Sequence, residues 1–92
     1  MIKIKLHTIL IFLIIVPSLL HAKNNNKAAL LNEAGLKHLK NRQYQLAAQL
    51  FKSAILKNSS KKHYYNNFAV ASIKLKHYKT AYFSLHISLK VH

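Results

Sequence analysis

The chain has 92 residues with no cysteine, one glycine and one proline, which excludes disulfides and thiolate metal sites and allows one small domain. Fifteen Lys and Arg residues face a single acidic residue, Glu33, so the net charge is +14. Such a surface attracts anions, including phosphate groups, anionic lipids and acidic protein segments. The scarcity of glycine and proline excludes a turn-rich β fold and predicts long helices.

Residues 1–22 have the pattern of an export signal. Two lysines precede an apolar run over residues 8–16, which is followed by Pro17 and then by Ala22. A basic start, a short apolar centre and a small final residue are typical of a secretory signal peptide that is cleaved after Ala22. The alternative is an uncleaved N-terminal membrane anchor, but the apolar run is shorter than the ~20 residues that span a bilayer as a helix. We therefore expect an exported protein, periplasmic or secreted.

Cleavage would leave residues 23–92 as the mature protein. This part carries thirteen basic residues and one acidic residue, a net charge of +12. Residues 23–27 have the composition of a polar linker. A single core in a chain of this size supplies little stability without disulfides, so the fold needs a further source of stability.

The first predicted helix pair covers residues 28–61. Apolar side chains recur at spacings of three and four over residues 31–39 and again over residues 44–55, with a polar break at residues 42–43. Residues 58–61 have the composition of a turn. Two helices joined by so short a break are expected to pack as an antiparallel hairpin.

The same pattern returns over residues 62–92 with a constant shift along the chain. The packing positions keep their residue class in the pairs Gly35/Ala69, Ala47/Ala81, Phe51/Leu85, Ala54/Ser88 and Ile55/Leu89. The sequence therefore predicts an all-α fold of two tandem antiparallel helix pairs.

A competing pattern occupies residues 83–92, which alternate between apolar and polar side chains as a β-strand does. As a helix, the segment is expected to turn three residues inward, namely Leu85, Ser88 and Leu89. Phe83 and Ile87 would then form a second apolar stripe. The register with the first pair favours the helix.

The repeat resembles the tetratricopeptide repeat family, whose period is about 34 residues and whose signature combines a small residue in the first helix with Ala-x-x-x-Phe in the second. The matching residues are Gly35 with Ala47 and Phe51, then, one such period later, Ala69 with Ala81 and Leu85. The resemblance covers residues 28–92, with a first repeat over 28–61 and an incomplete second repeat over 62–92. It implies a fragment of an α-solenoid. Such arrays usually need at least ~3 repeats and capped ends, so a truncated piece of a longer repeat protein is an alternative.

The resemblance also implies a peptide-binding groove on the inner face of the first helix of each pair. By register this face contains Asn32, Leu36, Leu39, Lys40, His63, Asn66, Asn67, Val70, Ile73 and Lys74. Amide and ammonium groups pair with the carboxylates of an acidic peptide. Lys40 and Lys74 have a second interpretation, because lysines near the ends of helices are stabilised by the helix dipole.

The last predicted helix carries additional apolar residues that predict an interface, namely Tyr82, Phe83, Ile87 and Val91. A contiguous apolar surface is rarely left in water on so small a protein. We expect this surface to bind a protein partner or a second copy of the chain.

No set of catalytic residues is visible in the sequence. One carboxylate cannot supply an acid–base pair, and the Asp or Cys of a nucleophilic triad is missing. The histidines lack the paired spacing of a metal site. We expect neither an enzyme nor a cofactor or metal, but an exported adaptor that binds an acidic protein or peptide. A cationic protein that associates with membrane surfaces is an alternative, whereas the export signal argues against a nucleic-acid partner.

Overall fold

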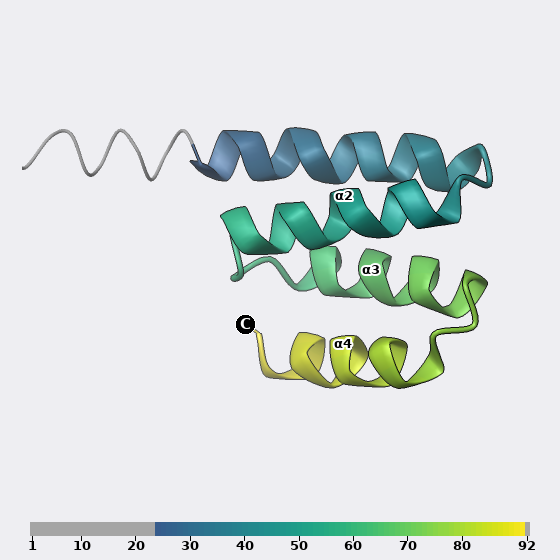
Figure 1. The fold of residues 1–92 in the computed structure, drawn as a ribbon. Helices are drawn as coiled ribbons and strands as arrows, with labels where there is room; N and C mark the ends of the chain where they lie inside the picture. Colours follow the sequence, from purple (N-terminus) through teal and green to yellow (C-terminus); the bar gives the residue numbers. More distant parts are fainter. Residues whose placement is uncertain (1–23, 92) are drawn as a thin grey trace, which may run out of the picture.

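The computed structural model describes residues 24–91, and the predicted signal peptide lies outside this range. Four helices make up the described part, namely α1 (residues 24–40), α2 (Tyr44–Lys57), α3 (Lys62–Lys74) and α4 (Tyr78–Lys90). They follow one another in chain order, each antiparallel to the one before, with α1 as the unlabelled blue helix (Figure 1). Residues 24–91 contain no strand. The predicted all-α fold of two antiparallel helix pairs is confirmed. None of the described helices is long and apolar enough to cross a membrane.

The turn between α1 and α2 closes in three residues. Arg42 adopts a left-handed backbone conformation with φ of 61°. The N–H of Gln43 donates to the carbonyl of His38 at 2.9 Å, and the N–H of Arg42 donates to that of Leu39 at 3.0 Å. This pair of hydrogen bonds satisfies carbonyls that the end of a helix leaves without partners. It also reverses the chain so that α2 packs back on α1.

The turn between α3 and α4 repeats this geometry at the equivalent position of the second pair. Lys76 has a φ of 63°. The N–H of His77 donates to the carbonyl of Ser72 at 2.8 Å, and that of Lys76 donates to Ile73 at 2.9 Å. The two turns therefore share the same backbone conformation at the positions that the sequence repeat makes equivalent.

The core lies between the first pair and α3. Phe51 of α2 is fully buried and packs with Ala47 and Ala48 of its own helix and with Ala71 of α3. Gly35 of α1 is buried against the same ring, because a Cβ at this position would lie 2.5 Å from Cε1 of Phe51. The small residues therefore allow the helices to approach closely around one aromatic ring.

A second buried cluster joins Ala28 of α1, Ala54 of α2 and Tyr64 of α3. Ala28 is fully buried, which fixes this part of α1 against α2 and α3. Residues 24–27, which were expected to belong to a linker, are helical and belong to α1.

The predicted turn between the pairs is present at residues 58–61. The side-chain oxygen of Asn58 accepts hydrogen bonds from the backbone N–H and the hydroxyl of Ser60, at 3.1 and 2.6 Å. The hydroxyl of Tyr65 donates to the carbonyl of Ser59 at 2.8 Å, which ties the turn to α3.

Helix α4 resolves the competing strand pattern, because residues 83–90 are helical. A strand would leave its backbone N–H and C=O groups without partners, since no other strand lies in the described part of the chain. A helix satisfies these groups internally. It also places Ala81, Ser84 and Ser88 on one side, where all three are buried against α3.

The prediction that three residues of α4 face inward was partly wrong. Ser88 is buried, but Leu85 is 42% exposed and Leu89 is 73% exposed. Their equivalents in α2 are Phe51, which is fully buried, and Ile55, which is half-buried. The difference arises because α3 covers that side of α2, whereas no described helix covers the same side of α4.

Candidate binding groove

Helix α4 contacts α3 through a narrow strip of small residues. The strip consists of Ala81, Ser84 and Ser88, at spacings of three and four. The hydroxyl of Ser84 donates to the carbonyl of Tyr65 in α3 at 2.7 Å, and this hydrogen bond is buried. Because the buried residues of α4 all have small side chains, its larger apolar residues lie on either side of this strip and are partly exposed. A helix that is apolar on several sides is normally buried on several sides.

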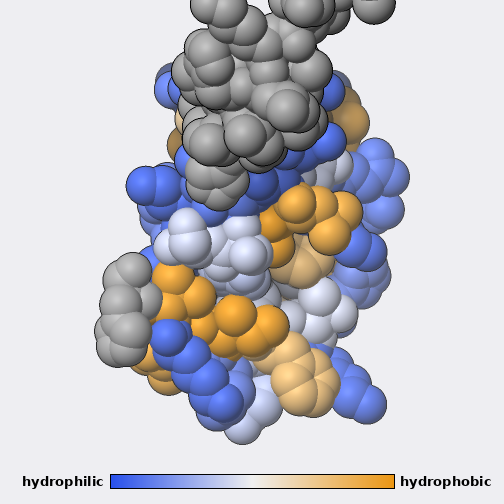
Figure 2. All heavy atoms as spheres, turned by 90° about the vertical axis from the view of Figure 1, so that its left-hand side faces the viewer, coloured by the Kyte–Doolittle hydropathy of each residue, from blue (hydrophilic) through white to orange (hydrophobic). Residues whose placement is uncertain are grey.

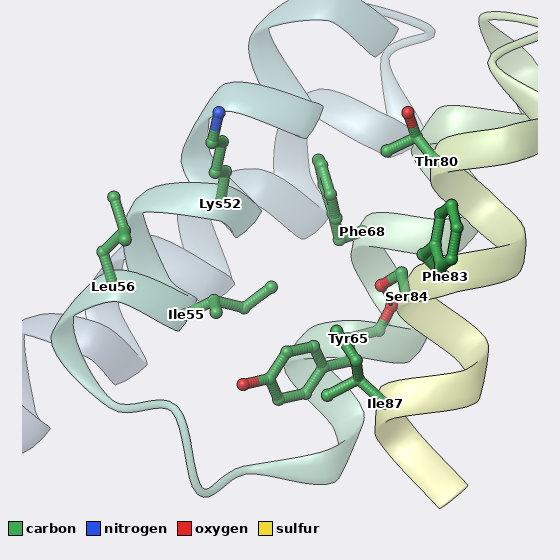
Figure 3. Close-up of a pocket in the computed structure, with 9 residues that line it drawn as sticks. All are labelled: Lys52, Ile55, Leu56, Tyr65, Phe68, Thr80, Phe83, Ser84 and Ile87. Carbon is green, nitrogen blue, oxygen red and sulfur yellow. Dashed lines mark hydrogen bonds between the residues drawn. The ribbon is translucent and has the colours of Figure 1, made fainter.

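One of these sides forms the wall of a groove. The cavity has a volume of about 340 Å³ and lies between α2 and α4, with α3 as its floor (Figure 3). Its lining residues are Lys52, Ile55 and Leu56 of α2, Tyr65 and Phe68 of α3, and Thr80, Phe83, Ser84 and Ile87 of α4. Ile55 and Phe68 point toward the space between α2 and α4. The larger side chains of the lining are apolar or aromatic, apart from Lys52.

A second hollow of about 310 Å³ continues the groove toward the start of α2 and α4. The two hollows share Lys52, Phe68 and Thr80. The second is more polar, with the additional lining residues Gln45, Ala48, Gln49, Ser72, Leu75 and His77. The groove therefore changes from apolar to polar along its length. Neither lining contains a carboxylate.

The electrostatics of the groove follow from the composition of the whole domain. Residues 24–91 carry twelve basic side chains and one acidic side chain, Glu33 of α1. Lys52 is exposed at the centre of the groove. A positive potential of this kind favours an occupant that carries carboxylates.

The peptide-binding face implied by the family resemblance lies elsewhere, on α1 and α3. The amide nitrogen of Asn67 donates to the side-chain oxygen of Asn32 at 2.9 Å, so these two predicted residues meet and bind each other. Asn32 is buried, and the apolar members are partly or about half exposed, namely Leu36, Leu39, Val70 and Ile73. Asn66 is half-buried, and the three basic members are exposed, namely Lys40, His63 and Lys74. Neither hollow of the groove is lined by a residue of this set.

The predicted interface residues of α4 are divided between two surfaces. Phe83 and Ile87 line the groove and are 53% and 43% exposed. Tyr82 does not line it, and its ring lies parallel to that of His86 at a centroid distance of 6.1 Å. Val91 follows the end of α4 and is half-buried.

The contributions of α2 and α3 to the groove were not predicted. Leu56 is 77% exposed and follows Ile55 directly, so it lies outside the apolar stripe of α2. One signal was available in the sequence. The repeat places Ser84 where the first pair has Leu50, and this smaller side chain leaves space beside α4.

Comparisons with known proteins do not place the chain in a family. Models of protein families, curated protein sequences and solved structures were each searched, and none of them matches.

Proposed function

We propose that the protein is an exported interaction module of the tetratricopeptide type, which holds an apolar segment of an acidic protein partner between α2 and α4. The observation that carries the proposal is the groove itself, an apolar hollow that is open to solvent and contains an exposed lysine. The sequence pattern of residues 1–22 supports export.

The energetics favour an apolar segment as the bound part. Burying a large apolar side chain completely contributes about 1.5–3 kcal/mol, so covering the exposed halves of Phe83 and Ile87 would contribute about 1 kcal/mol each. An ion pair with exposed Lys52 adds about 0–1 kcal/mol and mainly affects orientation and association rate. A peptide or helix with apolar residues on one side and carboxylates at one end fits both halves of the groove.

The direct test is photo-crosslinking in the native host. A photoreactive phenylalanine analogue replaces Phe83 in the groove and, in a control chain, replaces Leu46, which is 40% exposed but lies outside both hollows. We expect a crosslink from position 83 to an acidic segment of one exported protein, and none from position 46. Equal crosslinking from both positions, or crosslinking to lipid alone, would contradict the proposal.

A variant of the chain provides the second test. Phe83→Asp together with Ile87→Asp should abolish recovery of the crosslinked partner, because both substitutions place carboxylates in the apolar half of the groove. Leu46→Asp is the matched control and should retain the partner. Binding of the purified protein to anionic vesicles, with no effect of the double substitution on protein partners, would favour membrane-surface association instead.

The inner face of α1 and α3 stays a prediction. It depends on the family resemblance alone, and its two central amides are engaged with each other. Lys40→Ala and Lys74→Ala should leave partner recovery unchanged if the groove is the binding site.

A further inference from the structure

The second apolar side of α4 faces away from the groove. It consists of Tyr82, Leu85 and Leu89, at spacings of three and four, and none of them lines either hollow. Their exposed fractions are 66%, 42% and 73%. Figure 2 shows apolar surface at the level of α4, in patches next to hydrophilic surface. We call the surface formed by Tyr82, Leu85 and Leu89 the outer stripe.

The equivalent stripe of α2 already binds a helix. The shift that aligns the two repeats relates the outer stripe to Ala48, Phe51 and Ile55. Phe51 is fully buried and Ala48 is 8% exposed, and both pack in one cluster with Ala71 of α3. The outer stripe therefore presents to solvent the positions that, in the first pair, hold the following helix.

A basic edge accompanies the outer stripe. Lys79, His86 and Lys90 are exposed along α4 at spacings of seven and four, and the ring of His86 lies parallel to that of Tyr82. The same shift relates them to Gln45, Lys52 and Leu56 of α2. Two of the three positions are thus basic in α4 but uncharged in α2. An occupant of the outer stripe would meet more positive charge than α3 meets on α2.

The charge of this chain opposes a second copy as the occupant. Each copy carries twelve basic residues over residues 24–91 and one acidic residue, Glu33, which lies on α1, so like charges repel in such a pairing. Docking of α1 from another copy fails for a different reason. The residue of α1 equivalent to Ala71 is Lys37, which would place a charge against Leu85.

We infer that the outer stripe docks an amphipathic helix of another protein, with a small residue opposite Leu85 and acidic residues beside Lys79, His86 and Lys90. The small residue is expected because Ala71 occupies that place over Phe51. The acidic residues are expected from charge complementarity. This surface is separate from the groove, so the inference does not depend on what the groove binds.

The probe for the test is taken from the chain itself. A synthetic peptide with the sequence of residues 61–76 contains α3, the segment that covers the equivalent stripe of α2. In α3, Tyr65 and Ser72 line the two hollows that also contain Lys52 of α2. Since Lys52 is equivalent to His86 in the basic edge of α4, a helix that docks on α4 as α3 docks on α2 would turn these two positions toward the basic edge. The probe carries Tyr65→Glu and Ser72→Glu. A control peptide carries Tyr65→Gln and Ser72→Gln.

Binding is measured by isothermal titration calorimetry with the protein as it is purified from its host. We expect the glutamate peptide to bind at least tenfold more tightly than the glutamine peptide, with a difference that decreases as salt rises. Leu89→Asp together with Tyr82→Asp should abolish this binding. Both side chains are largely exposed, so the variant should keep the helical circular dichroism spectrum of the parent.

Two further variants separate this surface from others. Phe83→Asp with Ile87→Asp changes the groove and should leave peptide binding unchanged. Lys79→Glu with Lys90→Glu should reverse the preference, so that the glutamine peptide binds more tightly than the glutamate peptide. Absence of binding, equal binding of both test peptides, or binding that survives the outer-stripe variant would overturn the inference. A dimer of the protein alone that Leu89→Asp dissociates would also overturn it, because the occupant would then be a second copy.

Discussion

The contact between Gly35 and Phe51 makes a sharp prediction about the core. A Cβ at residue 35 would lie 2.5 Å from Cε1 and 2.7 Å from Cδ1 of the Phe51 ring. The ring is fully buried and enclosed by Ala47, Ala48 and Ala71, so it cannot move aside without displacing other atoms. Gly35→Ala should therefore overpack the crossing of α1 and α2.

The magnitude follows from two opposing effects. Replacing glycine by alanine inside a helix stabilises it by about 1 kcal/mol. Adding a methyl group to a well-packed core costs about 1–3 kcal/mol. We expect a net destabilisation of about 1 kcal/mol, measured by urea unfolding that is followed by far-ultraviolet circular dichroism. In a domain of this size, about 1 kcal/mol corresponds to a decrease of about 4–8 °C in Tm.

The second repeat supplies the matched control. At the equivalent positions it has Ala69 and Leu85, a larger residue paired with a smaller one. Gly35→Ala combined with Phe51→Leu copies this pair into the first repeat. The double variant should therefore lose less stability than the sum of the two single variants. Stabilisation by Gly35→Ala alone, or strict additivity of the two changes, would refute the proposed contact.

Three other predictions test the turns, the packing and the export signal. Arg42→Gly and Lys76→Gly should each stabilise the domain by on the order of 0.5–1 kcal/mol, because glycine adopts positive φ without strain; unchanged or lower midpoints of urea unfolding would argue against the two left-handed turns. Ala47→Leu should cost about 1–3 kcal/mol, because the side chain is fully buried between helices, and a neutral result would count against close packing there. N-terminal sequencing of the protein from its host should begin at Lys23, and an intact Met1 in the membrane fraction would indicate an anchor instead.

The sequence by itself determined the number of helix pairs in residues 28–91 and their turns. Spacings of three and four located α1 and α2, and the repeat of the same residue classes located α3 and α4. The polar break at residues 42–43 marked a turn whose backbone geometry recurs at residues 76–77. These features could be predicted because helices and turns depend mainly on residues that are close together in the sequence. Residues 24–27 were expected in a linker because they are polar, whereas they are helical next to the buried Ala28.

Only the tertiary structure decided which apolar residues of α4 are buried. The periodicity of Leu85 and Leu89 in α4 matches that of Phe51 and Ile55 in α2. Leu85 and Leu89 are nevertheless exposed, whereas Phe51 is buried and Ile55 is half-buried. Burial depends on whether another helix lies on that side, which periodicity within one helix does not encode. The groove could not be predicted from the sequence for the same reason. It is assembled from three helices and from the space beside Ser84, so it exists only once α2, α3 and α4 are packed together.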